Sequence, residues 1–427
     1  MYKEYLLTTI IHVSNIVLLK ILCIKMKKIA FLENSVQEYE WGSYTGIPEL
    51  LGKQPDFRKP YAELWMGAHP KSPSMVKREG RLVPLPDLIA HSPSDVLGQS
   101  VAVKFDNQLP YLFKVLAARK PLSIQAHPSI EQARAGFERE NNLNIPLDAF
   151  NRNYKDQNHK PECLCAISSF WALSGFRNRT DILNLMSRVC PQTLKEELAS
   201  FEQQPNEQGL KKFFYTLMTL NHEQKARVVS EAVQNAQSFF HNVPEFKWML
   251  RLHREYPSDI GILSPLMLNL ICLNPGQAIF LPARELHAYL YGVGIELMAN
   301  SDNVLRGGLT HKHIDVPDLL QVLNFHEQHV DILKSVDTID CEQAYPGMAK
   351  EFVLSVISVK DKQIYTSSEK RSMEILLCTK GSGEIFVPGR RQDKLYVSQG
   401  TSVIIPASVQ RYAISGCIVM YKAAVPI

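Results

Sequence analysis

The sequence predicts a mainly β protein whose strands are interrupted by a helical insert. Short apolar runs broken by Gly and Pro fill residues 29–177, a pattern typical of strands. Between residues 178 and 260 the apolar residues change to helical spacing, and strand-like runs return after Pro257. A chain of 427 residues is too long for one ordinary core, so we expect two or three packed units.

The composition is that of a globular protein, with 45% hydrophobic and 21% charged residues, and it excludes a chain that is disordered throughout. The formal net charge is only +4 and Lys and Arg are scattered, which argues against a nucleic-acid partner and allows a small anionic substrate. The eight cysteines, most of them in apolar stretches, predict reduced core thiols in a cytoplasmic protein rather than a disulfide framework. They are Cys23, Cys163, Cys165, Cys190, Cys272, Cys341, Cys378 and Cys417.

The first 25 residues contain the one stretch that suggests a membrane. Residues 6–24 lean apolar, but polar residues interrupt them, whereas a span needs about 20 predominantly apolar residues. The stretch also lacks the small-residue cleavage site of a signal peptide. We expect residues 1–25 to be a non-native or misassigned extension ahead of a start at Met26, and no membrane association. There are two alternatives. The segment could be a membrane anchor or signal peptide, or it could be a genuine N-terminal extension.

The β-rich first part predicts strands within Tyr39–Gly42, Pro60–Gly67 and Leu109–Ala118. In the insert, five apolar residues recur at i, i+3, i+4, i+7 and i+8, which places them on one face of a helix. They are Leu210, Phe213, Phe214, Leu217 and Met218. Helical spacing continues over Glu231–Phe240 and Glu245–His253.

After the insert, Leu266–Leu273 and Ala278–Pro282 predict further strands. A helix is predicted over Asp315–Leu323, with its first residue as the N-cap and Pro317 in the first turn. From about residue 350 the pattern is again one of short strands and turns.

One segment pattern occurs twice. Gly276–Pro282 is followed five residues later by His287, and Gly400–Pro406 is followed at the same spacing by Arg411. Such a turn and strand belongs to jelly-roll barrels of the cupin kind, in which the last position is usually a metal-binding His. We predict two cupin-like jelly-roll barrels plus an α-helical domain, with a metal in the first barrel only. The predicted parts after the extension are 26–177 for the N-terminal part of the catalytic barrel, 178–260 for the helical insert, 261–335 for the remainder of the catalytic barrel, and 336–427 for a metal-free C-terminal barrel.

Four residues could converge on a metal ion. Gln125 and His127 point to the same side of a strand because side chains alternate along it. Glu162 precedes an apolar strand, and His287 adds a second imidazole. Two neutral imidazoles, a carboxylate and an amide oxygen, with water in an open position, suit catalytic zinc better than structural zinc. Taken singly, each residue could also be an ordinary hydrogen-bonded polar group, so the spacing alone leaves the metal site open.

Several longer blocks resemble one known family. They are Trp41-Gly42-Ser43, Pro60-Tyr-Ala-Glu-Leu-Trp-Met-Gly67 with His69-Pro70, Lys120-Pro-Leu-Ser-Ile-Gln-Ala-His-Pro128, His159-Lys-Pro-Glu162 and Ala299-Asn-Ser-Asp-Asn-Val-Leu-Arg-Gly-Gly-Leu-Thr310. These blocks resemble the signature blocks of the type I mannose-6-phosphate isomerases. The resemblance keeps their order and runs from about residue 29 to the C-terminus. Glu40 and His311 depart from the family pattern, which commonly has a small residue and Pro there, and the first 25 residues have no counterpart.

The resemblance implies a barrel pair with a helical insert, one zinc ion per chain, and interconversion of mannose 6-phosphate and fructose 6-phosphate. It makes Arg306 the family's essential arginine. The implied zinc ligands are Gln125, His127, Glu162 and His287. Moving a proton between the first two carbons of an open-chain sugar creates an enediol or enediolate, whose negative oxygen zinc and the planar donors of Arg306 would stabilise. Arg306 could instead be a phosphate clamp or part of a structural ion pair.

Further residues are expected to contact the substrate. Lys114, Ser123 and Lys312 resemble the family's phosphate-end residues, and a hydroxyl with ammonium donors suits a dianionic phosphate. With Glu63 and Tyr289 they complete the predicted substrate-binding set. Lys114 and Lys312 could equally be solvated surface charges.

The group that moves the proton is left open by the sequence. The eligible general acids and bases are His159, Lys160, Glu296 and Asp302. Glu63, Glu296 and Asp302 could also orient substrate hydroxyls or brace loops. Cys163 and Cys165 closely follow a predicted ligand, but in an apolar strand we expect them to be core residues.

Two other functions stay open. A metal-dependent cupin oxygenase would hold iron, usually through two or three His, and Gln125 argues against it. A non-enzymatic sugar-binding cupin would not require Arg306 beside a metal set. The expected partner is a phosphorylated hexose, and we expect a monomer. The sequence does not decide between mannose catabolism and the supply of activated mannose.

Overall fold

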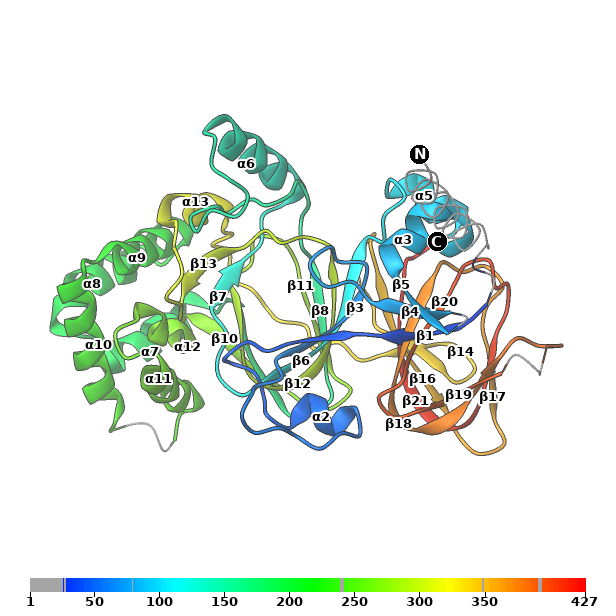
Figure 1. Ribbon diagram of the computed structural model, residues 1–427. Coiled ribbons are helices and arrows are strands. Elements are labelled where there is room, and N and C mark those ends of the chain that lie inside the picture. The colour runs from blue at the N-terminus through cyan, green and yellow to red at the C-terminus, as the bar shows by residue number, and fades with distance from the viewer. Residues whose placement is uncertain (1–25, 27, 79, 239–241, 348, 391–393) are drawn as a thin grey trace.

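The computed structural model describes residues 26, 28–78, 80–238, 242–347, 349–390 and 394–427. The strands form two large sheets, and a group of helices lies at one end of the molecule (Figure 1). The prediction that residues 1–25 are an extension lies outside the described residues. Met26 is buried, and its carbonyl accepts a hydrogen bond from Ser408 Oγ at 2.6 Å.

The first sheet has ten strands. They are β2 (Ser35–Gln37), β3 (Glu63–Gly67), β6 (Tyr111–Ala118), β7 (Ile124–Ala126), β8 (Glu162–Ala166), β9 (Phe170–Phe176), β10 (Leu268–Leu273), β11 (Ala278–Leu281), β12 (His287–Ala299) and β13 (Leu305–Gly308). The main order is β10-β9-β12-β6-β3-β2, and β12 also pairs with β7 and β8, which in turn pair with β13 and β11. Because β6 lies between β3 and β12 and is covered on both faces, all its residues are buried and its sequence is a nearly continuous apolar run.

The second sheet has eleven strands. They are β1 (Ala30–Glu33), β4 (Met75–Arg78), β5 (Arg81–Pro84), β14 (Val336–Ile339), β15 (Glu342–Ala344), β16 (Val353–Val359), β17 (Ile364–Thr366), β18 (Glu374–Phe386), β19 (Leu395–Ser398), β20 (Ser402–Ile405) and β21 (Ala413–Ala424). The main order is β14-β15-β16-β21-β18-β20-β1-β4-β5, with β17 on β21 and β19 on β18.

The N-terminal segment contributes to both sheets. Ala30 of β1 pairs with Ile404 of β20, and β4 and β5 continue the sheet from there. The assignment of residues 26–177 to the first barrel alone therefore misses this exchange, because strand pairing between distant segments leaves no local pattern. The domain boundaries themselves, and the closure of each sheet into a jelly-roll barrel, stay predictions.

The two sheets share one apolar core. Val115 and Ile295 of the first sheet belong to the same buried cluster as Ile375 and Ile404 of the second. The hydroxyl of Tyr111 donates to the carbonyl of Ala423 at 3.1 Å across this layer. The two sheets thus support each other.

The helical insert follows β9. It comprises α7 (Arg179–Val189), η1 (Gln192–Leu194), α8 (Lys195–Gln203), α9 (Glu207–Thr219), α10 (His222–Ala236), α11 (Pro244–Glu255), η2 (Ile260–Leu263) and α12 (Ser264–Met267). The predicted stripe on α9 is buried and packs in one cluster with Ile124, Leu173 and Leu286 of the first sheet. A mainly β fold with a helical insert is confirmed.

Other helices lie outside the insert. They are α2 (Gly46–Leu50), α3 (Leu85–His91), α4 (Pro93–Val96), α5 (Gln99–Lys104), α6 (Ile130–Asn142) and α13 (Val316–Val322). The predicted helix α13 is confirmed, and its cap Asp315 accepts a hydrogen bond from the backbone of Asp318. The strand-like interpretation of residues 29–177 missed α6, although Ser129 and Gln132 form a capping box that the sequence spells out.

The repeated Gly-to-Pro segments have the same local structure. Gly276 and Gly400 both adopt a φ of 85°, which favours glycine, and each lies just before a strand, β11 or β20. The residues that follow the two segments at the same spacing differ in burial. His287 is fully buried, whereas the Arg411 side chain is 54% exposed and pairs with Glu369 at 3.3 Å.

The seven described cysteines are free. Cys163 and Cys165 are buried in the core as predicted. The expectation of core thiols is wrong for Cys272 and Cys417, which are exposed. Alternation along β10 turns Cys272 outward while its two apolar neighbours are more buried. None of the helices in the described residues is long and apolar enough to cross a membrane.

Candidate active site

Two histidines and a glutamate form a buried cluster in the first sheet. His127 Nε2 lies 3.3 Å from Glu162 Oε1, and His287 Nε2 lies 3.4 Å from Glu162 Oε2. One possible ligand atom from each residue lies within 4.8 Å of the others. The three side chains are at most 1% exposed. Three of the four predicted metal ligands are therefore together.

Strand register explains how the remaining predicted ligand joins them. Gln125 of β7 is directly opposite His287 of β12 on one side and Arg306 of β13 on the other. Residues directly opposite in antiparallel strands point to the same face of the sheet. His287, Gln125 and Arg306 therefore form a row on one face, and His127 follows two residues after Gln125.

The histidine rings are oriented by their other nitrogens. His127 Nδ1 lies 2.7 Å from the carbonyl oxygen of Asn303, and His287 Nδ1 lies 3.0 Å from that of Glu285. A carbonyl can only accept, so each Nδ1 carries a proton, and each ring in its neutral form presents the lone pair of Nε2. Both Nε2 atoms are buried without a hydrogen-bond partner. A metal ion at the common point would satisfy both, so the donor set fits a zinc-type cation.

The local charges favour this ligand state. Burial lowers the pKa of His127 to about 4, with Lys160 acting in the same direction, so its ring is neutral near pH 7. Burial alone would raise the pKa of Glu162, but Lys160 and the two histidines hold it well below its usual range. Lys160 Nζ lies 3.0 Å from Glu162 Oε1. The cluster therefore presents an ionised carboxylate beside neutral imidazole.

A second ionic group is buried beside the cluster. Lys114 Nζ lies 3.1 Å from Glu296 Oε2 and 3.4 Å from Glu63 Oε1, and Trp65 Nε1 donates to Glu63 Oε2 at 2.8 Å. Burial would lower the pKa of Lys114, but Glu296 and Glu63 raise it. Lys114 is only 6% exposed, so it is not a solvated surface charge. Tyr289 is also buried, and its hydroxyl donates to Glu162 Oε2 at 3.3 Å.

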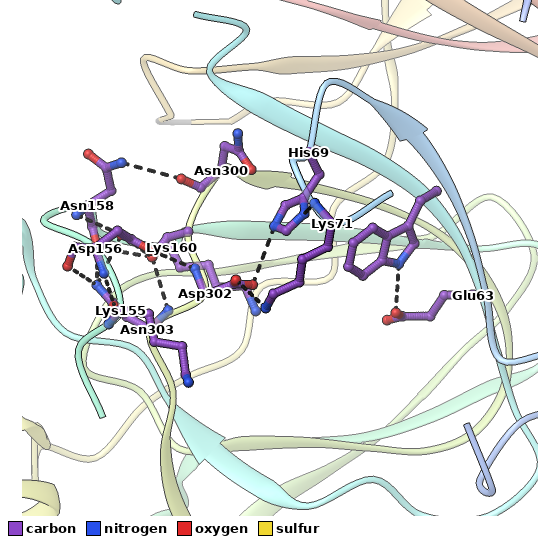
Figure 2. A network of polar contacts seen from close by, with 12 residues as sticks. Glu63, His69, Lys71, Lys155, Asp156, Asn158, Lys160, Asn300, Asp302 and Asn303 are labelled. Carbon is purple, nitrogen blue, oxygen red and sulfur yellow. Dashed lines mark hydrogen bonds and ion pairs between the residues drawn. The ribbon is translucent and has the colours of Figure 1, made fainter. Parts of the chain in front are cut away.

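Asp302 links the site to the loop after β3. Its carboxylate lies 2.6 Å from Lys71 Nζ and 3.5 Å from His69 Nε2, as Figure 2 shows. Burial would raise the pKa of Asp302, but His69 and Lys71 lower it. The ring of His69 packs edge-on against Trp65, whose indole N–H donates to Glu63. Asp302 is therefore connected to Glu63 through these two rings.

Asn303 fixes the loop that faces this group (Figure 2). Its Oδ1 accepts from the backbone of Lys155 and Asp156, and its Nδ2 donates to the carbonyl of Asn158 at 2.9 Å. The same residue provides the carbonyl that orients His127. One asparagine therefore connects the loop with the metal cluster.

Comparisons with known proteins agree with this geometry. Family models described as "Phosphomannose isomerase type I, catalytic domain" and "helical insertion domain" match residues 29–179 and 185–268. The mannose-6-phosphate isomerase of Escherichia coli is 40% identical over 389 residues, which is 90% of this chain and 96% of that protein. The chain belongs to the type I phosphomannose isomerase family.

More distant relatives and solved structures support the assignment. Mannose-6-phosphate isomerase 1 of Arabidopsis thaliana is 30% identical, with 93% of this chain and 94% of that protein covered. A mutant phosphomannose isomerase from Salmonella typhimurium has a TM-score of 0.88 at 37% identity, covering 94% of this chain and all of that one. A zinc-bound mannose 6-phosphate isomerase has a TM-score of 0.86. This type I phosphomannose isomerase is accordingly an enzyme.

The predicted residues of this isomerase are not all at the cluster. His159 is turned away, with its Nε2 3.0 Å from Glu351 Oε1, and it lines a separate cavity of about 510 Å³. Lys160, Glu296 and Asp302 have the contacts described above. Ser123 lies directly before β7, next to the strand that carries Gln125.

Arg306 and Lys312 belong to a group of cations near the cluster. Burial lowers the pKa of Arg306, and within the described part of the chain its side chain has no ion-pair partner. Burial, together with Arg306, Lys155 and Lys71, lowers the pKa of Lys312. Three other positive groups thus act on Lys312, and this concentration of positive charge suits an anionic ligand.

The sequence interpretation missed Trp65, His69, Lys71 and Lys155. The first two lie inside blocks that carried the resemblance, and Lys71 directly follows one of them. An alternating Glu63 and Trp65 in one strand was a usable signal, because such residues share a face. Lys155 had no local signal.

Proposed function

We propose that this isomerase interconverts D-mannose 6-phosphate and D-fructose 6-phosphate at one zinc ion held by its predicted ligand set. The ligands are Gln125, His127, Glu162 and His287. The observation that carries the proposal is the pair of buried imidazole Nε2 atoms, each without a hydrogen-bond partner, that converge on an ionised Glu162. A monomeric state and a cytoplasmic location stay predictions.

The chain's own groups supply positioning and charge. Zinc, when bound, would polarise substrate oxygens as a Lewis acid. Arg306, which has no ion-pair partner and lies beside Gln125, would stabilise the negative oxygen of the enediolate with its planar donors. This role is supported by strand register rather than by sequence spacing alone.

Among the four candidate acids and bases, Lys160 is the best placed to move the proton. Its ammonium group is 3.0 Å from the ligand Glu162. Glu296 is engaged by Lys114, and Asp302 by Lys71 and His69, so these carboxylates are better suited to orienting hydroxyls. His159 is engaged by Glu351 outside the cluster.

The phosphate group of the substrate would bind among the cations near Arg306. Lys312 and Ser123 are the predicted contacts, and Lys71 and Lys155 join them because their charges act on Lys312. Lys114 is better placed to hold Glu63 and Glu296 than to reach a phosphate, since it is buried between them. Glu63 would then act on the sugar as part of the buried group of Lys114, Glu63 and Glu296, and Tyr289 would act through Glu162.

An assay of isomerase turnover tests the function. We expect the protein to convert mannose 6-phosphate to fructose 6-phosphate in a coupled assay, to lose this activity on chelation, and to regain it with zinc. Mannose without its phosphate should be a poor substrate, because the cation group would then lack its anion. Full activity after verified metal removal would exclude the metal role, and no turnover of the holoprotein would exclude the proposed reaction.

Zinc binding should release about one proton per chain near pH 6, rather than about two. His127 is already neutral there because burial lowers its pKa to about 4. Burial also acts to lower the pKa of His287, but the nearby Glu162 carboxylate outweighs this and raises the pKa above its usual range. The apo protein therefore carries a proton on His287 that the metal must displace, and the release should vanish as the pH rises above that pKa. Calorimetry in buffers of different ionisation enthalpy measures the number, and release of two protons would contradict the assignment.

A further inference from the structure

The segment that brings Lys160 to the site is fixed at its two ends. The carbonyl of Asn158 accepts from Asn303 Nδ2 at 2.9 Å and from Ser301 Oγ at 3.2 Å (Figure 2). The carbonyl of Pro161 accepts from the backbone of Ala299 at 3.0 Å, immediately before β8 begins. Within the part of the chain that the structure describes, the backbone of the two residues between them forms no hydrogen bond.

Those two residues are held by side chains that point in opposite directions. Lys160 reaches Glu162 in the metal cluster, and His159 reaches Glu351 at 3.0 Å on the other side. Glu351 lies just before β16 of the second sheet, so this ion pair ties the active-site segment to the other half of the fold. The hydrogen bond is direct, and it spans 192 residues of sequence.

Little else restrains the His159 ring. It borders the cavity of about 510 Å³, which Asn158, Asn300 and Lys350 also line. The ring is 32% exposed, whereas the Glu351 carboxylate is only 16% exposed. The pairing with His159 is the main contact that stabilises the Glu351 carboxylate in the described structure, ahead of hydrogen bonds from the backbone of Glu351 and Lys350.

We infer that Glu351 is a positioning residue, which acts through His159 to hold Lys160 against the metal cluster. This inference rests on the proposed function, because it concerns the same site. A two-residue stretch without backbone hydrogen bonds can shift readily, and displacements of about 1 Å in a catalytic group are enough to slow a reaction strongly. The second sheet would thus contribute to turnover without touching the substrate.

The test is the Glu351→Ala holoenzyme. Removing the tether should lower kcat by about tenfold, as loss of a supporting partner typically does, while KM and zinc content stay near the wild-type values. Hydrogen exchange in the peptide covering residues 158–161 should increase. His159→Asn should give a similar loss, and the double variant should be no worse than either single one, because both remove the same contact.

Two further variants separate positioning from general damage. Glu369→Ala breaks an exposed ion pair with Arg411 in the same half of the fold, and it should change neither kcat nor hydrogen exchange at residues 158–161. Glu351→Gln keeps the length and an acceptor oxygen for His159, so it should recover most of the turnover. If the Ala variant does not fold, His159→Asn removes the same contact from the other side and provides the test.

Three results would overturn the inference. They are an unchanged kcat in folded Glu351→Ala, additive losses in the double variant, and a far larger loss in His159→Asn than in Glu351→Ala, since the last would make His159 itself the reacting group. The proposed function fails separately, namely if the wild-type holoenzyme does not isomerise mannose 6-phosphate.

Discussion

Replacing Arg306 with Ala should lower kcat by about 10² to 10³, the usual effect of removing one donor from a developing oxyanion. The guanidinium is in the row formed by β12, β7 and β13, directly opposite Gln125, and has no ion-pair partner in the described structure. If its donors bind charge that exists only in the enediolate, substrate binding should change far less than turnover. Steady-state kinetics with mannose 6-phosphate measures both.

The Lys variant and the metal content sharpen this expectation. Arg306→Lys should recover little activity, because an ammonium on a flexible stem does not reproduce the planar fork. Zinc should stay at about one ion per chain, because Arg306 is not among the predicted ligands. Arg411→Ala is the matched control, since this exposed arginine pairs with Glu369 in the connections between strands of the second sheet. Near-normal kcat with a raised KM in Arg306→Ala would instead make Arg306 a phosphate clamp.

The metal cluster could be predicted because its information is local. Gln125 lies on β7 and His127 directly follows the end of that strand, so the alternation of extended backbone predicts that both point to one side. Their convergence with Glu162 and His287 could not be derived from spacing, because it depends on two separate strand pairings, of β12 with β7 and of β12 with β8. The resemblance to the family supplied that step. The cluster of His127, Glu162 and His287 agrees with it.

The position of His159 illustrates what sequence could not give. A histidine that directly precedes a cluster lysine and lies three residues before Glu162 is a reasonable candidate base on spacing alone. Its ring direction depends on Glu351, which is 192 residues away in the chain and belongs to the other half of the fold. No local pattern specifies such a partner, so the candidate set for the base stayed open.

The same reasoning applies to the fold. The insert could be predicted because a helical stripe such as that on α9 is contained in one segment. The exchange of β1 into the second sheet could not, since Ala30 pairs with Ile404 near the other end of the chain. Each strand is short and apolar, and its pattern is compatible with either sheet.

Replacing His287 with Ala should abolish zinc binding at neutral pH and reduce turnover to the level of the chelated enzyme. The ring is fully buried, its Nδ1 is fixed by the carbonyl of Glu285, and its Nε2 has no hydrogen-bond partner, so nothing else in the described structure uses that lone pair. Ala leaves a gap that water can enter but supplies no nitrogen ligand. Metal analysis of the purified protein and the coupled assay with added zinc measure the two effects.

Tyr289→Phe is the matched variant, because it lies two residues along the same strand and removes a hydroxyl that contacts Glu162 and Glu296. Its hydroxyl supports a ligand rather than binding the metal, so zinc affinity and activity should fall by about 10- to 100-fold and excess zinc should restore much of the turnover. Excess zinc should restore His287→Ala much less. In Tyr289→Phe all the ligands are present and a higher zinc concentration can fill the weakened site, whereas in His287→Ala added zinc does not replace the missing nitrogen. If both variants recovered equally with zinc, His287 would not be a zinc ligand but would only position one, and another residue would have to provide the second nitrogen ligand.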